Sequence, residues 1–253
     1  MKKLVYIMAS LLGWSLLATS CDDNVQAPNK PTPQTTATPK AETPVKRTEK
    51  PTQRPLPDVC DTLMCQGYVF VSQPIPVDVK QRMLGNSLPD STKVPFAQLR
   101  YLTLPYYDFD GKIQMGEMVC NKAIADDLLD IFRTLFKEVY PFYSIRLVDD
   151  FDASDEASMQ ANNTSCFNYR TIEGSWRLSR HAFGMAVDVN PLQNPCVKGS
   201  RIRPATAVDY VDRDMDFPHK IDKDDLCKQV FTAHGFRWGG RWRSMKDWQH
   251  FEK

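Results

Sequence analysis

The chain has 253 residues, and its 32 basic and 31 acidic side chains leave a formal net charge of +1. A near-neutral chain without basic runs between aromatic residues excludes an electrostatic nucleic-acid binder, so we expect no nucleic-acid partner. The length suits one globular domain preceded by a targeting segment and a linker.

The N-terminus has the order of a secretory signal. Lys2 and Lys3 precede an apolar run over residues 4–17, and small residues then lead to Cys21. This order predicts a signal peptide over residues 1–20, and the run is too short for an ordinary membrane-spanning helix. The position of Cys21 resembles a bacterial lipobox, in which the cysteine becomes a lipidated N-terminus. The alternative is a plain signal peptide with a coincidental cysteine.

Residues 21–57 read as the lipidated cysteine and a linker rich in Pro, Thr and Lys. Such a segment buries too little apolar surface to fold, and its prolines favour extended conformations. We therefore expect one domain over residues 58–253, held in the cell envelope, in the periplasm or at the outer membrane, by a lipid anchor on Cys21. We expect this domain to be a monomer.

Six cysteines follow Cys21. An even number in an exported chain predicts partial disulfide pairing, and the alternative is buried free thiols. Six cysteines allow 15 pairings, among which the sequence does not choose. They are Cys60, Cys65, Cys120, Cys166, Cys196 and Cys227.

The first half of the domain predicts a hairpin followed by a helix. Residues 99–107 and 113–119 alternate as strands around the turn signal Asp110-Gly111. Residues 121–138 carry apolar side chains at helical spacing, with Asn121 as the expected cap. A strand over residues 143–148 and a short polar helix over residues 154–162 come next.

The second half predicts a strand over residues 184–190 that turns Val187 and Val189 to a core and Asp188 to an open face. A helix follows over residues 224–233, stopped by Gly235. The end reads as Gly- and Trp-rich loops with a final short strand. Strands mixed with a few helices, without regular βαβ alternation, indicate an α+β fold.

The residues most able to carry chemistry are histidines and carboxylates near the C-terminal end. A catalytic zinc ion takes three protein ligands from His and carboxylate and keeps one open position. His181, Asp188 and His250 would supply such a set, and Asp247 stands three residues before His250. The other two histidines, His219 and His234, have no comparable polar residues near them in the sequence. Any one of the four candidate site residues would by itself be weak evidence for a metal site.

Taken together, Ser-x-His-x-x-Gly-x-Ala-x-Asp and the later Asp-x-x-His resemble a known family. It comprises zinc D-Ala-D-Ala carboxypeptidases and L-alanyl-D-glutamate endopeptidases, which cut peptidoglycan stem peptides. The vancomycin-resistance dipeptidases belong to it, and the Hedgehog domain shares its fold. Further resemblance lies in Asn168-Tyr169-Arg170, Gly174-Ser175, Asn190-Pro191 and Trp238-Gly239-Gly240-x-Trp242.

The resemblance implies a role for each matching residue. His181, Asp188 and His250 would bind Zn²⁺, and Asp247 would be the general base for the attacking water. Arg170 would steady a substrate carbonyl, a carboxylate or the developing oxyanion. Many family members carry Glu where this chain has Asp247. Glu252 could orient the ring of His250 or be an ordinary surface carboxylate.

Three functions stay open from the sequence. The first is a zinc metallopeptidase acting on peptidoglycan stem peptides, as a D-Ala-D-Ala carboxypeptidase or an L-Ala-D-Glu endopeptidase. The second is a catalytically inactive peptidoglycan-binding lipoprotein with the same fold, against which Asp247 argues. The third is a serine or cysteine hydrolase, which the lack of a Gly-x-Ser-x-Gly elbow disfavours.

Overall fold

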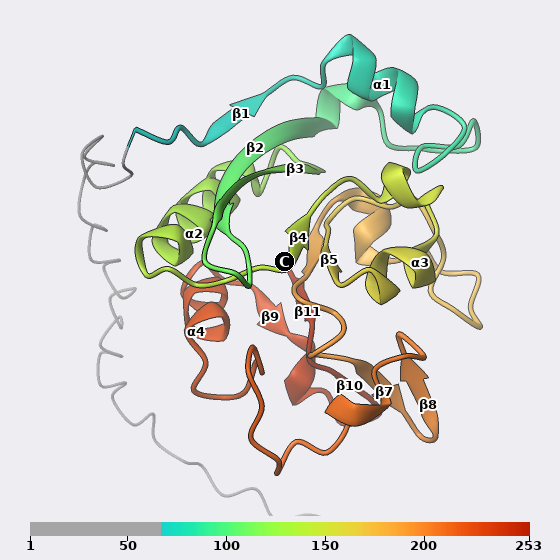
Figure 1. Cartoon of the computed structure of the whole chain (residues 1–253). Coiled ribbons are helices and arrows are strands. Elements are labelled where there is room, and N and C mark those ends of the chain that lie inside the picture. Colours follow the sequence, from blue (N-terminus) through green and yellow to red (C-terminus); the bar gives the residue numbers. More distant parts are fainter. Residues whose placement is uncertain (1–66) are drawn as a thin grey trace, which may run out of the picture. The chain divides into compact units, whose positions relative to one another are not determined.

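The structure, a computed structural model, describes residues 67–253 (Figure 1). The predicted signal peptide, Cys21, the linker and the start of the predicted domain lie outside the described residues. Among the helices of residues 67–253, none combines the length and apolarity that crossing a membrane requires.

Helices and several small sheets are mixed along the described chain, which confirms the α+β class. The helices are α1 (Val77–Met83), α2 (Ala125–Lys137), α3 (Asp155–Gln160) and α4 (Leu226–Ala233). The strands are β1 (Val71–Gln73), β2 (Leu99–Tyr107), β3 (Ile113–Asn121), β4 (Ser144–Ile145), β5 (Asn163–Thr164), β6 (Ala186–Asp188), β7 (Cys196–Lys198), β8 (Arg201–Arg203), β9 (Arg237–Trp238), β10 (Lys246–Asp247) and β11 (His250–Glu252). Short 3₁₀ helices are η1 (Phe96–Gln98), η2 (Val148–Phe151), η3 (Arg180–Phe183), η4 (Val208–Tyr210) and η5 (Gly239–Arg241).

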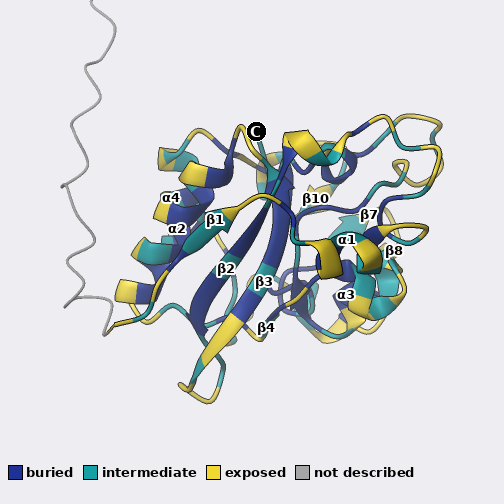
Figure 2. Cartoon of the chain, turned by 90° about the horizontal axis from the view of Figure 1, so that it is seen from above, coloured by how far each residue is buried: buried dark blue, intermediate teal, exposed yellow. Residues whose placement is uncertain are grey.

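The predicted hairpin is the longest sheet element. β2 and β3 pair antiparallel from Leu99↔Asn121 to Tyr107↔Ile113, and β1 pairs with the other edge of β2. Its tip is closed by Asp108, whose backbone amide donates to Lys112 O at 2.8 Å. Figure 2 shows the hairpin exposed near this tip and buried further along, where α2 and the later strands cover it.

The helix α2 buries an apolar stripe against this hairpin and against α4. The stripe predicted from helical spacing is buried as expected: Ile124, Leu128, Leu129, Ile131, Phe132 and Leu135. The predicted cap is wrong, because the helix starts at Ala125 and Ile124 is its N-cap. Asn121 instead ends β3, where its side chain accepts from Ala123 N and donates to Phe183 O, both at 3.0 Å.

A second sheet, ordered β6-β11-β9, carries the segment with the predicted ligands. Val187 and Val189 lie in the main apolar core, as the strand pattern predicts. The open face predicted for Asp188 is wrong in degree, since only 6% of this residue is exposed. Phe251 anchors the partner strand by stacking on Phe231 of α4, with ring centroids 4.4 Å apart.

A third sheet, ordered β10-β7-β8, stands beside the second. Its hairpin β7–β8 was not predicted from the sequence, and its register places Asp247 opposite Cys196. The strand predicted over residues 143–148 is reduced to β4, which pairs parallel with β5.

The thiols within the described residues are free. Cys120, Cys166 and Cys227 are buried and Cys196 is half-buried. Burial raises the pKa of each of these thiols, so they stay protonated and behave as small apolar groups. Partial pairing is therefore not found among these four, and Cys60 and Cys65 lie outside the described residues.

Gly184 ends η3 with a left-handed backbone, at φ +64°. A Cβ here would lie 2.6 Å from Asn121 N, so Gly184→Ala must strain the backbone and displace β3. Gly199→Ala is the matched control, because φ is +60° and no atom lies within 4 Å. We expect Gly184→Ala to lower the unfolding free energy by about 1 to 3 kcal/mol more than the control. Chemical denaturation measures both, and equal losses would contradict the packing constraint.

Asp225 caps α4 by accepting from Lys228 N at 3.2 Å and lies near Tyr140. Burial raises the pKa of Asp225 from 3.8 to about 6 in the folded protein. The folded state therefore binds the proton more tightly, and this stabilisation is lost as the pH rises through about 6.

Asp225→Asn keeps a capping side chain but removes this titration. We expect the unfolding free energy of the variant, relative to wild type, to rise by about 2 kcal/mol between pH 4 and pH 7.5. Asp224→Asn, at an exposed neighbour, is the control. A difference independent of pH for Asp225→Asn would contradict the assignment.

Candidate metal centre

Three elements bring His181, Asp188 and His250 to one point. His181 Nε2 lies 3.2 Å from Asp188 Oδ2 and 3.2 Å from His250 Nδ1, and His250 Nδ1 lies 2.9 Å from Asp188 Oδ1. All three residues are buried. These are the three metal ligands expected from the sequence, and they come from η3, β6 and β11.

The ring of His181 is fixed from behind. Ser179 caps η3 by accepting from His181 N at 3.3 Å, and His181 Nδ1 lies 2.7 Å from the carbonyl oxygen of Cys166. A carbonyl only accepts, so Nδ1 carries the proton and donates. The lone pair of Nε2 is therefore left facing Asp188 and His250.

The ring of His250 is also held from behind, but here Nε2 faces the outer partner and Nδ1 faces the other donors. Its Nε2 lies 3.4 Å from Glu252 Oε2, and Glu252 is itself paired with Arg237 at 2.6 Å. A carboxylate behind a histidine fixes which nitrogen is protonated and raises the basicity of the other. Of the two interpretations left open for Glu252, the geometry favours the one in which it orients His250.

The electrostatics at this point favour a positive charge. Burial acts to lower the pKa of His250, but the carboxylates of Asp188, Glu252 and Asp247 outweigh it and raise the pKa to about 10. Burial acts to raise the pKa of Asp188, but charge and hydrogen bonds from His181 and His250 hold it well below 3.8. A buried carboxylate between two imidazoles is thus stabilised by any cation at the centre.

The donor set fits zinc. Bonds of about 2.0–2.1 Å in tetrahedral geometry need ligand atoms about 3.3 Å apart, close to the separations of these donors. Two imidazole nitrogens and one carboxylate are a set that zinc takes in catalytic sites, with one position left open. Each imidazole also has the outer hydrogen-bond partner that such sites require.

Asp247 lies beside the three donors without joining them. It faces Cys196 across the β7–β10 pair, with the Cys196 thiol beside its carboxyl. Its Oδ1 is buried and has no hydrogen-bond partner among the described residues. Burial, aided by the charge of Asp188, raises the pKa of Asp247 to about 6. A buried acceptor without a donor is costly, so this oxygen is suited to a guest molecule.

Gly239 explains how Asp247 approaches the histidine so closely. A Cβ at Gly239 would lie 2.6 Å from Asp247 O and 3.3 Å from His250 Cβ. Only a residue without a side chain allows this contact between η5 and the two site residues. Trp242, at the end of η5, then sits with its ring centroid 5.2 Å from that of His250.

Arg170 reaches the same cavity from the loop before η3. Its guanidinium binds Asp155 Oδ1 at 2.8 Å, and Asp155 Oδ2 binds Arg203 at 2.6 Å. The Nε atom of Arg170 is buried and has no partner among the described residues. Asp155 and Arg203 were not predicted as site residues, because ion pairs between distant segments leave no local pattern in a sequence.

These groups line a cavity of about 410 Å³. The three donors, Asp247, Arg170 and Glu252 all border it. The same lining includes Lys198, Arg177, Arg180, Arg201, Arg203 and Arg237. Seven basic side chains against five carboxylates leave this lining with an excess of positive charge, which suits a ligand that bears carboxylate groups.

The two remaining histidines take no part in the cluster. His219 stacks on Phe109 with centroids 3.6 Å apart, and His234 lies 3.4 Å from Asp127. Both have packing and ion-pairing roles elsewhere in the described chain, as expected from their sequence surroundings.

The comparisons with known proteins agree with this geometry. A family model described as D-alanyl-D-alanine carboxypeptidase matches residues 173–253, which contain His181, Asp188, Asp247 and His250. This third of the chain is therefore similar to a peptidase family whose members are zinc enzymes. Arg170 lies outside the matched range. No curated protein and no solved structure matches the chain.

The cluster predicts a specific pattern of zinc retention. We expect the wild-type chain to hold about one zinc ion, and His181→Ala or His250→Ala to lose it, because a site with three ligands cannot spare one. His219→Ala and His234→Ala are matched controls that should keep it. Elemental analysis of the purified variants gives the zinc content. Zinc retained by His250→Ala, or lost by His219→Ala, would contradict this ligand set.

Proposed function

We propose that the protein is a zinc-dependent metallopeptidase that hydrolyses peptide bonds in peptidoglycan stem peptides. One observation carries the proposal: three zinc-type donors and an unsatisfied carboxylate meet in one cavity, inside the range that matches the peptidase family. A module that only binds peptides has no need of this combination.

His181, Asp188 and His250 would hold the metal, and Asp247 and Arg170 would act on the reacting groups. Zinc in such a site supplies Lewis acidity and lowers the pKa of a bound water to about 7. Asp247 Oδ1 would accept a proton from the attacking water and return it to the leaving amine. This assignment depends on the position of the oxygen, which is buried beside the metal donors and accepts no hydrogen bond from any residue that the structure describes.

Arg170 would stabilise negative charge on the substrate. Arg170 lines the cavity, its buried Nε has no partner among the described residues, and its terminal nitrogen is held by Asp155. A fixed guanidinium gains in effect where charge develops in a site that excludes water. The same guanidinium could instead bind a carboxylate of the substrate.

The scissile bond is either D-Ala-D-Ala at a chain end or L-Ala-D-Glu within the stem. The basic residues around the cavity favour a substrate with carboxylates, and both candidates have them.

The proposed function also fits the proposed location of the protein. A lipid on Cys21 and a linker to residue 57 would let a monomeric domain reach the peptidoglycan from a membrane of the cell envelope.

Digestion of purified muropeptides by the full chain tests the activity. Mass spectrometry of the products identifies the bond, because loss of a terminal alanine and release of the stem from L-Ala differ in mass. We expect one of these two products in the presence of zinc and none after chelation. A protein that binds muropeptides but leaves them intact would instead be the inactive binding lipoprotein.

Asp247→Asn separates the general base from the ligands. The amide keeps the shape of the side chain and cannot take a proton, so zinc should stay while kcat falls by about a hundredfold or more. Asp130→Asn, on the exposed face of α2, is the control for loss of a carboxylate. Loss of zinc in Asp247→Asn would make this residue a ligand, and full activity would move the base elsewhere.

A further inference from the structure

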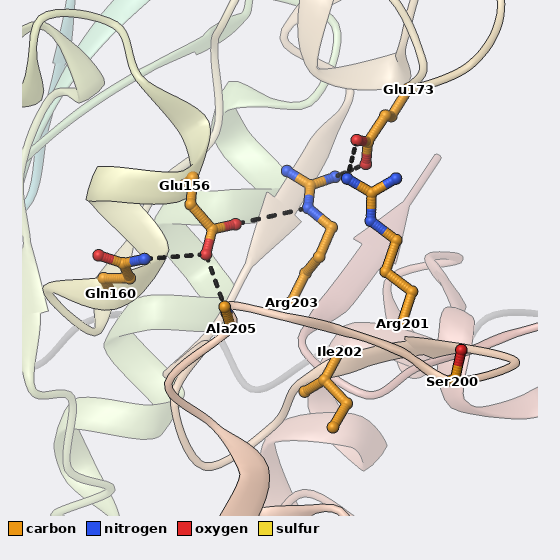
Figure 3. Close-up of a pocket in the computed structure, with 8 residues that line it drawn as sticks. All are labelled: Glu156, Gln160, Glu173, Ser200, Arg201, Ile202, Arg203 and Ala205. Atoms are coloured by element: carbon orange, nitrogen blue, oxygen red, sulfur yellow. Dashed lines mark hydrogen bonds and ion pairs between the residues drawn. The ribbon is translucent and has the colours of Figure 1, made fainter.

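A second cavity, of about 670 Å³, shares part of its lining with the cavity of the candidate metal centre. Figure 3 shows the residues that line it. It lies between α3, the loop before η3 and the β7–β8 hairpin. Its charged lining consists of Glu156, Glu173, Arg201 and Arg203, with Gln160 and Ser200 as neutral polar groups. No residue of the metal cluster takes part in it.

The two cavities are separated by side chains that they share. Glu173, Arg201 and Arg203 border both. Figure 3 shows Glu173 reaching from its loop to the two arginines of the hairpin. Arg201 pairs with Glu173, and Arg203 Nη1 lies 3.3 Å from Glu173 Oε2.

The shared wall has a movable part and a fixed part. The side chains of Arg201 and Glu173 are 61% and 43% exposed, so their ion pair is solvated and costs little to exchange. Arg203 is only 23% exposed and is also bound by Asp155 at 2.6 Å. Glu156, which lines the second cavity but not the first, is fixed as well, since it accepts from Ala205 N at 2.8 Å and Gln160 Nε2 at 3.0 Å.

The charges of the cavity are balanced. Two carboxylates face two guanidinium groups, and each carboxylate lies within 4 Å of a guanidinium nitrogen. A ligand with charge of one sign would take one partner and leave the other unpaired, which is unfavourable. A ligand that carries an ammonium and a carboxylate can replace both partners at once.

We infer that this cavity is a subsite for a zwitterionic substrate group, namely a peptide side chain that ends in both an ammonium and a carboxylate. Arg201 would bind the carboxylate through its planar fork, and Glu173 would bind the ammonium. The inference rests on the proposed function for its substrate, a stem peptide whose cleaved bond lies in the neighbouring cavity.

Three synthetic peptides test the subsite: L-Ala-γ-D-Glu followed by meso-diaminopimelate, by lysine or by 2-aminopimelate. Their last side chains end in both charges, in the ammonium alone and in the carboxylate alone. Binding is measured by calorimetry on the full chain with zinc, and mass spectrometry checks that each peptide stays intact. If the wild-type protein cleaves any of the peptides, binding of all three is measured on the Asp247→Asn variant instead.

We expect the diaminopimelate peptide to bind at least tenfold more tightly than either of the other two. Arg201→Gln should remove its advantage over the lysine peptide, and Glu173→Gln its advantage over the aminopimelate peptide. Arg201→Lys, which keeps the charge and loses the fork, should fall between. Arg133→Gln removes an arginine from a surface ion pair on α2 and should change nothing.

Equal affinity for the three peptides would overturn the subsite, as would a preference that survives Arg201→Gln and Glu173→Gln. The proposed peptidase activity has a separate test, since it is refuted if the protein does not cleave muropeptides. A binding preference without hydrolysis would therefore refute the activity and keep the subsite, while hydrolysis without preference would do the reverse.

Discussion

The antiparallel pairing of β6 with β11 places Asp188 directly opposite His250. The other features of the candidate site depend on this register, since a slip of one strand by one residue would turn its side chain away from the face that the other ligand occupies. The two residues are 62 positions apart in the chain, so the pairing closes a long loop. Phe251, fully buried and stacked on Phe231, favours this register because a slip of one residue would turn it away from the core.

The loop closed by this pairing contains the β7–β8 hairpin, β9, η5 and β10. Because β10 pairs with β7, the same loop returns Asp247 to the donors and also forms one wall of both cavities. The groups that would do chemistry are therefore buried and tightly packed, while the groups that would select a substrate lie on a solvated hairpin. Arg203 connects the two regions through Asp155, which holds Arg170.

The sequence was most informative where function and local pattern coincide. Short spacings among His181, Gly184 and Asp188, and between Asp247 and His250, were weak signals singly, and their combined resemblance to a known family nominated the residues that meet in the structure. The β2–β3 hairpin and α2 were predictable because alternation and helical spacing are local signals. Asn121 was misjudged, since its amide can cap a helix or bond to a distant carbonyl, and only tertiary contact with Phe183 decides between them.

Other features could not be predicted because they depend on contacts between distant segments. The pairing of Asp155 with Arg170 and Arg203 joins residues 15 and 48 positions apart with no periodic signal, and Cys196 meets Asp247 only through strand register. Partial disulfide pairing was expected from export and an even count. The four described thiols are free, since pairing requires two cysteines brought together by the tertiary fold and the fold does not do this for any of the four.

The contact between Trp242 and His250 also gives the protein an optical property. An indole excited by ultraviolet light is quenched by a protonated imidazole at contact distance, through transfer of an electron to the ring. Loss of that proton, or its replacement by a metal ion, changes the efficiency of this transfer. Trp242 is one of five tryptophans in the chain, and its position makes its share of the emission the one that would change with the state of His250.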